Sequence, residues 1–420
     1  MKNRKIKIAV IGLGYVGFPV FFELNKKFQT IGYDLNQERI LSLKNGIDQN
    51  KQYLKFNPKK LLLTDNIYDL KNFDVFIITV PTPIDKKYRP DLKPLKNACI
   101  NVGKIMKKGS IVVFESTVYP GCTENFCVPI LSKYSKLKYN KDYYCGYSPE
   151  RINVGDQRYT LKKITKIISA SNIFALKKIK KIYQSIVTPQ LHVASSIKVA
   201  EAAKLIENIQ RDMNIAFINE LSVIFKKINI NTHEVLDAAA TKWNFHRYFP
   251  GLVGGHCIGV DPYYLTYLAK KINYKPKVLL SGRFINENMS EYVTQRIKKH
   301  LNIYFKKKKV KILILGITFK ENCNDVRNTK IVRIYRNLIK LNHKVDVYDP
   351  NVDDMEMKKI YKIEMLKQIE TKYDYCLIAV RHKEFIKLTK KRIKSFLKRK
   401  SFVFDLKNSL NFELKNYERL

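Results

Sequence analysis

With 420 residues, 45% of them hydrophobic, the chain can form two or three domains with sizeable cores, but no stretch reaches the roughly 18 apolar residues that a membrane-spanning helix needs. The formal charge of +42 arises from 79 basic and 37 acidic side chains spread along the whole sequence, which argues against nucleic-acid binding and favours a field that attracts an anionic substrate. The seven cysteines include no Cys-x-x-Cys pair, which argues against a disulfide framework and a structural metal site; without a secretory signal, they favour a reducing cytoplasm.

The N-terminal stretch has the pattern of a dinucleotide-binding fold. A strand over Ile6–Ile11 runs directly into the glycine motif Gly12–Gly17, a helix follows over Phe18–Lys27, and a second strand over Gln29–Tyr33 ends at Asp34. Such glycines let a pyrophosphate approach the N-terminus of a helix, whose backbone N–H groups attract anions. The residues of this motif that we expect to contact a cofactor are Gly12, Gly14, Tyr15, Val16 and Gly17.

Asp34 bears on the choice between the two nicotinamide cofactors. Its carboxylate can accept hydrogen bonds from a ribose diol and would repel a 2′-phosphate, so we expect NAD rather than NADP. Arg39 lies close by in the sequence and is a further candidate cofactor contact, although an arginine can instead favour a 2′-phosphate.

Three further strands are each expected to end in a polar or proline-rich loop, where doubly wound sheets bind their ligands. These strands cover Asp74–Val80, Ser110–Phe114 and Tyr143–Tyr147. Thr82, Ser116 and Thr117 are candidate ligand contacts in the first two loops, although turn chemistry explains their hydroxyl groups equally well. Glu150 and Arg151 follow the third strand, where a glutamate can be a base or a solvated loop charge.

A single long helix is expected over Ile197–Ile228, because this stretch contains no proline or glycine and its apolar residues recur at helical spacing. It would serve as a spine between domains or as a dimer contact. Lys204 and Asn208 are four residues apart and share one helical face, so they could act together on an oxygen atom. The alternative is a solvated stripe that also includes Glu201 and Arg211.

The stretch Gly254–Tyr264 carries a thiol in a glycine-rich segment. Three glycines and one proline in it predict a loop rather than a helix or strand. Cys257 can be a nucleophile with Asp261 as a nearby charge partner. Equally, it can be a buried cysteine in a tight turn.

The last third repeats the alternation of strands and helices without the glycine motif, so a second dinucleotide is not expected there. The expected elements are a strand over Val310–Leu315, a helix over Lys330–Leu341 and strands over Lys344–Asp349, Tyr373–Ala379 and Ser401–Leu406. Lys320 and Arg327 flank the first crossover and suit nucleotide phosphates, although surface charge explains them as well.

The predicted fold is α/β, with two Rossmann-like doubly wound domains joined by a long central helix and a helical dimerisation domain. We expect the NAD-binding domain over residues 1–190, the central domain over 191–300 and a Rossmann-like domain for a second nucleotide over 301–420.

Taken in order, these motifs resemble the UDP-glucose/GDP-mannose dehydrogenase family nearly from end to end. The sequence of Gly254–Tyr264 is similar to that of the branch that oxidises UDP-N-acetylhexosamines for surface polysaccharides. The same holds for Trp243-Asn244-Phe245 and Tyr119-Pro120-Gly121-Cys122. The motifs that carry the resemblance to the family are Gly12–Gly17, Pro81–Pro83, Ser116–Gly121, Ser148–Arg151, Glu201–Lys204 with Asn208, Gly254–Asp261 and Phe319–Arg327.

The resemblance implies a homodimer or larger oligomer that converts a sugar C6 alcohol into a carboxylate with two NAD. Cys257 would bind the aldehyde as a thiohemiacetal and then carry a thioester. Lys204 would stabilise the oxyanion, and Asn208 and Asp261 would position Lys204 or a water molecule. Glu150 would help water to hydrolyse the thioester, with assistance from Thr117.

The resemblance also implies the remaining ligand contacts. Arg327 would reach NAD together with Thr82, Ser116 and Thr117, Lys320 would bind the substrate, and Arg247 would meet the sugar or a neighbouring subunit. The expected substrate residues are Glu150, Arg151, Lys204, Asn208, Arg247, Gly254 and Lys320.

Three other functions stay open on the sequence. A UDP-glucose 6-dehydrogenase would use the same chemistry with a different sugar pocket, and the gluco and galacto epimers of an N-acetylated sugar differ only in one hydroxyl group. A two-electron hydroxyacid dehydrogenase would share the first domain and need no thiol. A basic nucleic-acid-binding protein would bind with a steep dependence on salt.

Overall fold

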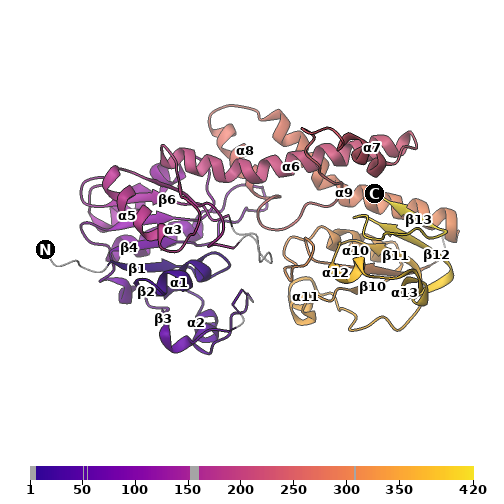
Figure 1. The fold of residues 1–420 in the computed structure, drawn as a ribbon, viewed down its shortest axis with the longest axis horizontal. Coiled ribbons are helices and arrows are strands. Elements are labelled where there is room, and N and C mark those ends of the chain that lie inside the picture. Colours follow the sequence, from indigo (N-terminus) through magenta and orange to yellow (C-terminus); the bar gives the residue numbers. More distant parts are fainter. Residues whose placement is uncertain (1–5, 51, 54, 152–159, 307–308) are drawn as a thin grey trace. The chain divides into compact units, whose positions relative to one another are not determined.

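The computed structural model describes residues 6–50, 52–53, 55–151, 160–306 and 309–420, and the chain divides into two compact units. The first unit contains Met1–Glu207 and Tyr263–Tyr274, and the second unit contains Asn208–Pro262 and Lys275–Leu420. The helices α6 (Ile197–Lys227) and α8 (Asp261–Lys271) contribute residues to both units (Figure 1). The three-part division 1–190, 191–300 and 301–420 stays a prediction.

An eight-stranded sheet with the order β3-β2-β1-β4-β5-β6-β7-β8 forms the first unit. Its strands are β1 (Lys7–Ile11), β2 (Gln29–Tyr33), β3 (Leu62–Thr64), β4 (Val75–Ile78), β5 (Ile111–Phe114), β6 (Tyr144–Tyr147), β7 (Ile167–Ala170) and β8 (His192–Val193). Its helical elements besides α6 and α8 are α1 (Gly17–Asn25), α2 (Gln37–Lys44), η1 (Pro58–Lys60), η2 (Ile67–Leu70), α3 (Lys93–Ile105), η3 (Thr123–Cys127), α4 (Val128–Ser135) and α5 (Ile173–Gln184).

The strand directions of this sheet determine which of its edges is expected to bind a ligand. Neighbouring strands pair in parallel, except that β6 and β7 are antiparallel, with Tyr147 opposite Ser169. Alternate apolar residues of β1 and β4, such as Val10 and Ile77, pack with α1, α2 and α5 in one core. Because β7 runs the other way, its first residues lie at the edge where β5 and β6 end.

A five-stranded parallel sheet with the order β10-β9-β11-β12-β13 forms the second unit. Its elements are α7 (Thr232–Ala239), α9 (Lys277–Phe305), β9 (Lys311–Leu315), α10 (Ile331–Lys340), β10 (Lys344–Tyr348), α11 (Asp354–Tyr361), β11 (Tyr373–Ile378), α12 (Lys383–Ile386), α13 (Lys390–Ser395), β12 (Leu397–Asp405) and β13 (Tyr417–Arg419).

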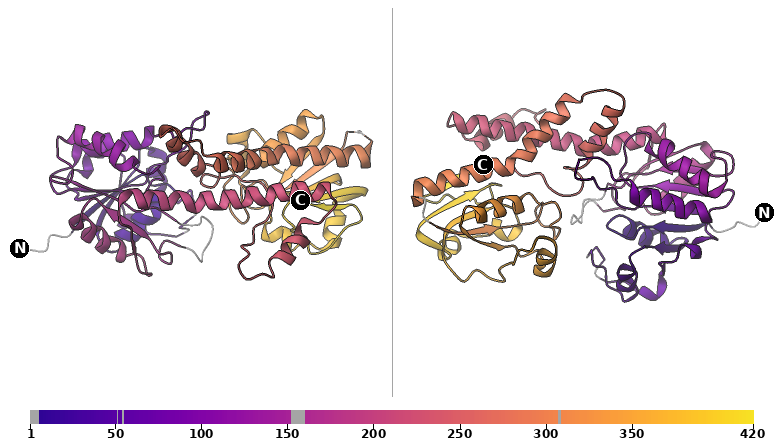
Figure 2. Two further views of the ribbon diagram at one scale, coloured as in Figure 1. Left: turned by 90° about the horizontal axis from the view of Figure 1, so that it is seen from above. Right: turned by 180° about the vertical axis from the view of Figure 1, so that it is seen from behind.

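Both faces of this second sheet are buried, as expected for parallel strands. Ile312 and Ile314 of β9 pack in a core that contains residues of α9 and α10, whereas Leu313 and Leu315 pack in the opposite core with residues of α12 and α13. Figure 2 shows α9 running along this unit.

The predicted fold of two Rossmann-like parallel sheets joined by a long helix is confirmed. Each predicted strand is observed within one or two residues of its predicted bounds, except that β12 begins at Leu397 instead of Ser401. The strands β3, β7, β8 and β13 were not predicted. One local prediction is wrong: Asp261–Tyr264 is not a loop but the first turn of α8. Pro262 fits there because the first turn of a helix has no internal partner for backbone N–H groups.

The long helix α6 is fixed to the first unit through Glu201. The Glu201 carboxylate accepts hydrogen bonds from the backbone N–H groups of Gly121 (2.5 Å) and Thr123 (2.9 Å). Glu201 is fully buried, and Lys204 and Asn208 are 9% and 8% exposed. The alternative of a solvated stripe is therefore wrong for these three residues, although Arg211 is exposed.

The buried Glu201 should make the stability of the protein depend on pH. Burial outweighs the two backbone hydrogen bonds and raises the pKa of Glu201 to about 7. A carboxyl whose pKa is raised on folding stabilises the protein below its unfolded pKa and loses that contribution as pH rises to the folded pKa. We expect the unfolding free energy of wild type relative to Glu201→Gln to fall by about 3 kcal/mol between pH 4.5 and pH 7. Urea unfolding of both proteins across this range measures the difference, and parallel curves would contradict it.

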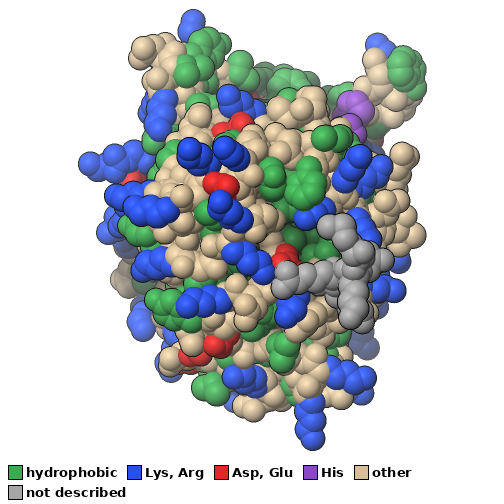
Figure 3. Space-filling view, turned by 90° about the vertical axis from the view of Figure 1, so that its left-hand side faces the viewer, with side chains coloured by type: hydrophobic (Ala, Val, Ile, Leu, Met, Phe, Trp, Pro, Cys, Tyr) green, Lys and Arg blue, Asp and Glu red, His purple; other side chains and the backbone are tan. Residues whose placement is uncertain are grey.

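The excess positive charge is dispersed on the face of the molecule that Figure 3 draws, where Lys and Arg side chains alternate with apolar and neutral ones. Within the described ranges, no helix combines the length and the apolar character that crossing a bilayer requires. Elsewhere α6 exposes large apolar side chains, among them Ile206, Phe217 and Ile224, and the exposed Ile228 directly follows the helix.

Candidate active site

The glycine motif between β1 and α1 forms a tight turn with open space above its middle glycine. Gly12 has a φ of +91°, in the left-handed region, and a side chain on Gly17 would collide with the carbonyl oxygen of Gly12. By contrast, a Cβ on Gly14 would have nothing within 4 Å. Tyr15 and Val16 are partly exposed beside it. The loop therefore leaves room for a ligand to approach the backbone at Gly14.

Asp34 and Arg39 hold this loop from both sides of Leu13. The backbone N–H of Leu13 donates to Asp34 Oδ2 (2.7 Å), and Arg39 Nε donates to the Leu13 carbonyl (2.9 Å). Arg39 Nη2 donates to Asp48 Oδ1 (2.8 Å), and Arg39 is only 6% exposed. Arg39 thus braces the loop from within the domain, which weakens the argument that it receives a 2′-phosphate.

These residues fit a dinucleotide without a 2′-phosphate. Gly14 opens the space for the pyrophosphate, and the partly exposed Asp34 carboxylate lies at the end of β2, where a ribose diol would meet it. A metal site is not formed in the described ranges, where His, Cys, Asp and Glu side chains make no group of three or more able to hold an ion.

Hydroxyl groups in the loops after β4 and β5 join the two loops by hydrogen bonds. Thr82 donates to the carbonyl oxygen of Thr117 (2.7 Å), and Ser116 donates to that of Val80 (2.6 Å). Tyr264 of α8 donates to the carbonyl oxygen of Thr82 (2.7 Å). The structure therefore brings the predicted residues Thr82, Ser116 and Thr117 together at one edge of the sheet, with turn-stabilising roles for the Thr82 and Ser116 hydroxyl groups.

Glu150 belongs to a buried ion cluster of the first unit. Lys166 Nζ lies 3.1 Å from Glu150 Oε2 and 3.0 Å from Glu115 Oε2, and the Tyr183 hydroxyl donates to Glu115 Oε1 (2.5 Å). Burial raises the pKa of Glu115. Burial alone would lower the pKa of Lys166, but the two carboxylates outweigh burial and raise the Lys166 pKa. Sequence reasoning missed Lys166 and Tyr183. The antiparallel pairing of β7 with β6 brings Lys166 to Glu150, and Tyr183 reaches Glu115 from α5.

Arg151 is also engaged in the first unit. Its Nε lies 2.8 Å from Glu207 Oε1 of α6, and its Nη1 donates to the Thr165 carbonyl (2.9 Å). Residues 152–159, which complete the segment after Arg151, lie outside the described residues.

Cys257 is the exposed cysteine of the chain. Its carbonyl oxygen accepts hydrogen bonds from the backbone N–H groups of Val260 (3.0 Å) and Asp261 (2.8 Å), which form the turn before α8. The other six cysteines are buried, and burial raises the pKa of thiols such as Cys145 and Cys376. All seven lie in described residues, so Cys257 is the thiol that a ligand can reach.

Asp261 and Asn208 form the polar pair of the second unit. Asn208 Nδ2 donates to Asp261 Oδ2 (2.6 Å), and both residues are buried. Lys204, which belongs to the first unit, precedes Asn208 by four residues in α6. The pair predicted at i and i+4 is therefore formed by one helix, and Asn208 connects that helix to the residue that follows the cysteine turn.

The two glycines before Cys257 are required by close packing. Gly255 has a φ of +82°, and a Cβ on it would lie 2.7 Å from the ring of Phe319. A Cβ on Gly254 would lie 2.8 Å from the carbonyl oxygen of Asn328. The cysteine loop therefore packs against the segment that follows β9, and this segment carries the predicted Lys320 and Arg327.

His256 and Arg327 both contact Asp325 in this segment. His256 Nε2 lies 3.0 Å from Asp325 Oδ2, and Arg327 contacts both Asp325 oxygens through Nε (3.0 Å) and Nη2 (2.8 Å). Burial alone would raise the pKa of Asp325, but the hydrogen bonds from His256 and Arg327 hold it well below its usual range. Asp325 is a residue that sequence reasoning missed, and it orients Arg327.

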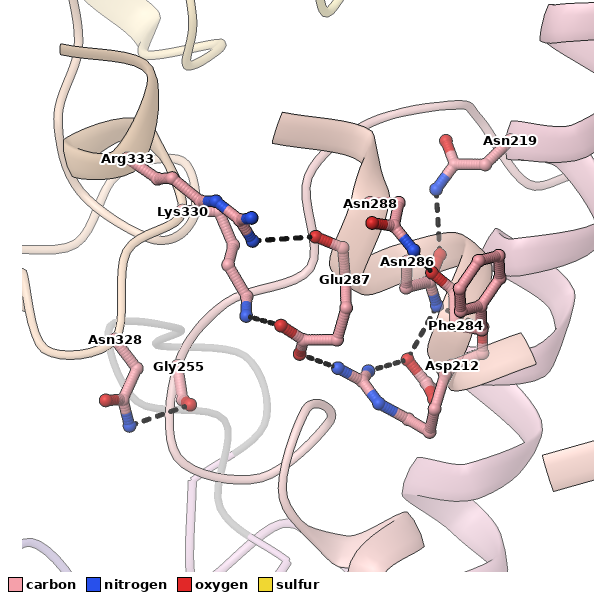
Figure 4. A network of polar contacts seen from close by, with 11 residues as sticks. Asp212, Asn219, Gly255, Phe284, Asn286, Glu287, Asn288, Asn328, Lys330 and Arg333 are labelled. Carbon is pink, nitrogen blue, oxygen red and sulfur yellow. Dashed lines mark hydrogen bonds and ion pairs between the residues drawn. The ribbon is translucent and has the colours of Figure 1, made fainter. Parts of the chain in front are cut away.

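A buried polar network supports the other end of the cysteine loop (Figure 4). Asn219 of α6 donates to the Gly251 carbonyl (3.0 Å) and accepts from the Gly251 N–H (2.7 Å). Asn219 also donates to Asn286 of α9 (2.8 Å), which donates to Asp212. Arg283 continues the network, with Nη1 2.7 Å from Asp212 Oδ1.

Glu287 extends this network to the segment before α10. Glu287 Oε1 accepts a hydrogen bond from Arg283, and Lys330 Nζ lies 2.5 Å from Glu287 Oε2. Figure 4 shows the contact between Glu287 and Lys330. The network therefore fixes α6, α9 and the start of the cysteine loop relative to one another inside the second unit. Sequence reasoning missed these residues, which lie scattered along two long helices.

Lys320 and Arg247 are the remaining predicted contacts of the second unit. Lys320 Nζ lies 5.7 Å above the Phe319 ring, next to the glycine pair. Arg247 is exposed, pairs with Asp237 and lies 4.9 Å from the Phe249 ring. Neither contact by itself identifies a ligand.

The residues 6–187, 198–288 and 313–412 match, respectively, the NAD binding domain, the central domain and the UDP binding domain of the UDP-glucose/GDP-mannose dehydrogenase family. The chain is 47% identical over 418 residues to the UDP-N-acetyl-D-glucosamine 6-dehydrogenase of Salmonella typhi, with 97% of each chain covered. It is 47% identical over 413 residues to the protein of the same name from Pseudomonas aeruginosa, with 97% and 98% covered. The UDP-D-ManNAc dehydrogenase structure from Pyrococcus horikoshii matches with a TM-score of 0.88 and 29% identity, covering 99% of this chain and 98% of that one.

Proposed function

Because the chain belongs to the UDP-glucose/GDP-mannose dehydrogenase family and is an NAD-dependent UDP-sugar 6-dehydrogenase, we propose that it oxidises the C6 alcohol of a UDP-N-acetylhexosamine to the uronic acid. The observation that carries this proposal is Cys257, an exposed thiol in a close-packed glycine loop. A four-electron oxidation passes through an aldehyde, and a thiol can hold that aldehyde covalently between the two oxidations.

Cys257 acts as the nucleophile. Its thiolate forms a bond to the aldehyde carbon, and the carbonyl oxygen takes up the displaced electron pair and a proton, which gives a thiohemiacetal. The thioester is the oxidised form of this adduct. NAD, when bound, supplies the hydride acceptor for each of the two oxidations.

Lys204 stabilises the negative charge that develops on the substrate oxygen and helps to keep Cys257 ionised. Asn208 and Asp261 position Lys204 or a water molecule. The 2.6 Å hydrogen bond between Asn208 and Asp261 supports this assignment, because it fixes both side chains next to the cysteine turn.

Glu150 activates the water that hydrolyses the thioester, and Thr117 assists in binding that water. Water adds to the thioester carbon, Glu150 accepts one of its protons, and the carbon–sulfur bond breaks with the sulfur leaving as a thiolate. No electrons are transferred in this step.

The remaining candidate residues bind the two nucleotides. The proposed NAD contacts are Gly12, Gly14, Tyr15, Val16, Gly17, Asp34, Arg39, Thr82, Ser116, Thr117 and Arg327. The proposed substrate contacts are Glu150, Arg151, Lys204, Asn208, Arg247, Gly254 and Lys320.

A panel of UDP-sugars tests the substrate. We expect UDP-N-acetyl-D-glucosamine or its galacto epimer to be oxidised with two NADH formed per sugar. We expect kcat/KM for UDP-glucose to be roughly 10²-fold lower, because a site that hydrogen-bonds the N-acetyl group leaves polar atoms unpaired with glucose. Absorbance at the NADH band with product analysis measures both. Faster oxidation of UDP-glucose would instead identify a UDP-glucose 6-dehydrogenase, and one NADH per sugar would contradict the four-electron reaction.

The product would enter a capsule or O-antigen type of polysaccharide, and the enzyme would act in the cytoplasm as a homodimer. The exposed apolar side chains of α6 support the dimer contact, and sedimentation of the purified protein tests it.

A further inference from the structure

Three buried side chains with no role in the proposed reaction form a cluster with Glu150 in the first unit. Lys166 Nζ lies 3.1 Å from Glu150 and 3.0 Å from Glu115, and it also lies 3.4 Å from the Pro149 carbonyl oxygen. Tyr183 donates its hydroxyl to the other Glu115 oxygen (2.5 Å). Lys166 and Glu115 are only 3% and 2% exposed, so water does not screen these interactions.

The strand directions of the sheet bring these groups together. Glu115 directly follows β5, Glu150 follows β6 by three residues, and β5 and β6 are parallel neighbours. Lys166 directly precedes β7, and β7 is antiparallel to β6. The start of β7 therefore lies at the edge where β5 and β6 end. All three charges are carried by residues next to rigid strands, which fixes their separation.

The cluster combines one ammonium group with two carboxylates, so its net charge is −1 when all three are ionised. The Lys166 ammonium is the shared counter-charge of the two carboxylates. If Lys166 were absent, the two buried carboxylates would lose this shared partner. The second Glu150 oxygen accepts the N–H of Arg151 (2.6 Å), which fixes the orientation of the carboxylate.

We infer that Lys166 is a positioning residue for thioester hydrolysis, which orients the Glu150 carboxylate to accept a proton from the attacking water, and that Glu115 and Tyr183 hold Lys166 in place. This inference rests on the proposed role of Glu150. Lys166 contacts neither the sugar nor the reacting water; it acts through Glu150 alone. Its loss should slow hydrolysis and leave the two earlier oxidations nearly unchanged.

The test uses the full-length enzyme with saturating UDP-N-acetyl-D-glucosamine, or whichever UDP-sugar the panel selects, and NAD. The variants are Lys166→Met and the double variant Lys166→Met/Glu115→Gln. The double variant removes one positive and one negative charge together, so it leaves the formal net charge of the cluster at −1 and serves if the single variant does not fold. Lys162→Met is the matched control, because Lys162 is a half-exposed lysine of the same segment that pairs with Glu23 (3.1 Å).

Rapid mixing with acid quench and intact-protein mass spectrometry follow the covalent adduct. In the Lys166 variants we expect a burst of two NADH per active site, a hydrolysis rate about 10²-fold below wild type and an accumulating sugar adduct on the enzyme. Hydroxylamine attacks a thioester without help from a general base, so it should restore turnover in these variants. Lys162→Met should behave as wild type.

A structural role alone would give a different result: the burst and the steady-state rate would fall in proportion, and no adduct would accumulate. That result, or hydrolysis at the wild-type rate, would overturn the inference. Glu150→Gln is measured in parallel to separate the inferred role of Lys166 from the proposed role of Glu150. If Glu150→Gln accumulates the adduct and the Lys166 variants do not, only the role of Lys166 is wrong; if Glu150→Gln does not, the proposed role of Glu150 is wrong as well.

Discussion

Replacing Cys257 with serine should reduce the formation of the uronic acid by roughly 10³-fold or more, because a hydroxyl group is far less ionised than a thiol near neutral pH and so cannot trap the aldehyde. Binding of the UDP-sugar should change little, since the substitution alters one atom of an exposed side chain. Acid product quantified by chromatography and UDP-sugar binding measured by calorimetry separate the two effects.

Cys376→Ala is the control for loss of a thiol as such. Cys376 is a fully buried residue of β11 in the core of the second unit, so its truncation should lower stability by about 1 kcal/mol through lost packing and leave the reaction rate unchanged. Iodoacetamide should inactivate the wild-type enzyme by alkylating Cys257. A Cys257→Ser enzyme that makes the acid at a near-normal rate would refute the nucleophile.

The sequence predicts those parts of this protein that depend on neighbouring residues in the chain. Residues 6–34 are such a case, with a strand, a glycine turn, a helix and a second strand. The apolar pattern of each strand and helix predicts that element, and the glycines predict the tight turn. The helix α6 is another, since 31 residues without proline or glycine carry a regular apolar stripe.

Contacts between distant strands escape such reasoning. Lys166 is one of 79 basic residues, and nothing in its immediate neighbours distinguishes it from a surface lysine. Its burial against Glu115 and Glu150 follows from the antiparallel direction of β7, which no short pattern indicates. Arg39 is a similar case, because its bond to Asp48 depends on where the chain after α2 returns.

The helical start of α8 was missed for a different reason. Three glycines and a proline argue against a helix throughout Gly254–Tyr264, but the three glycines precede Asp261 and the proline occupies the first helical turn. The position of a helix-breaking residue within a stretch therefore matters more than its presence.

Replacing Glu150 with glutamine should make the enzyme accumulate its covalent thioester intermediate. Glutamine has nearly the shape of glutamate but accepts no proton from water, so the adduct should form and then hydrolyse roughly 10²- to 10⁴-fold more slowly. The neutral amide also leaves Lys166 with Glu115 as its carboxylate partner, so the formal net charge of the cluster changes from −1 to neutral and one ammonium stays paired with one carboxylate.

The trapped species has a defined mass. Intact-protein spectra after incubation with UDP-sugar and NAD should show the enzyme plus one sugar nucleotide, and peptide mapping should place the adduct on Cys257. Hydroxylamine should release it as a hydroxamate, since a thioester gives a hydroxamate, whereas the aldehyde in equilibrium with a thiohemiacetal gives an oxime. If the Glu150→Gln enzyme turns over normally with no adduct, water is activated by another group, and the cluster of Glu115, Lys166 and Tyr183 would then serve only to bind the loop after β6 to the sheet.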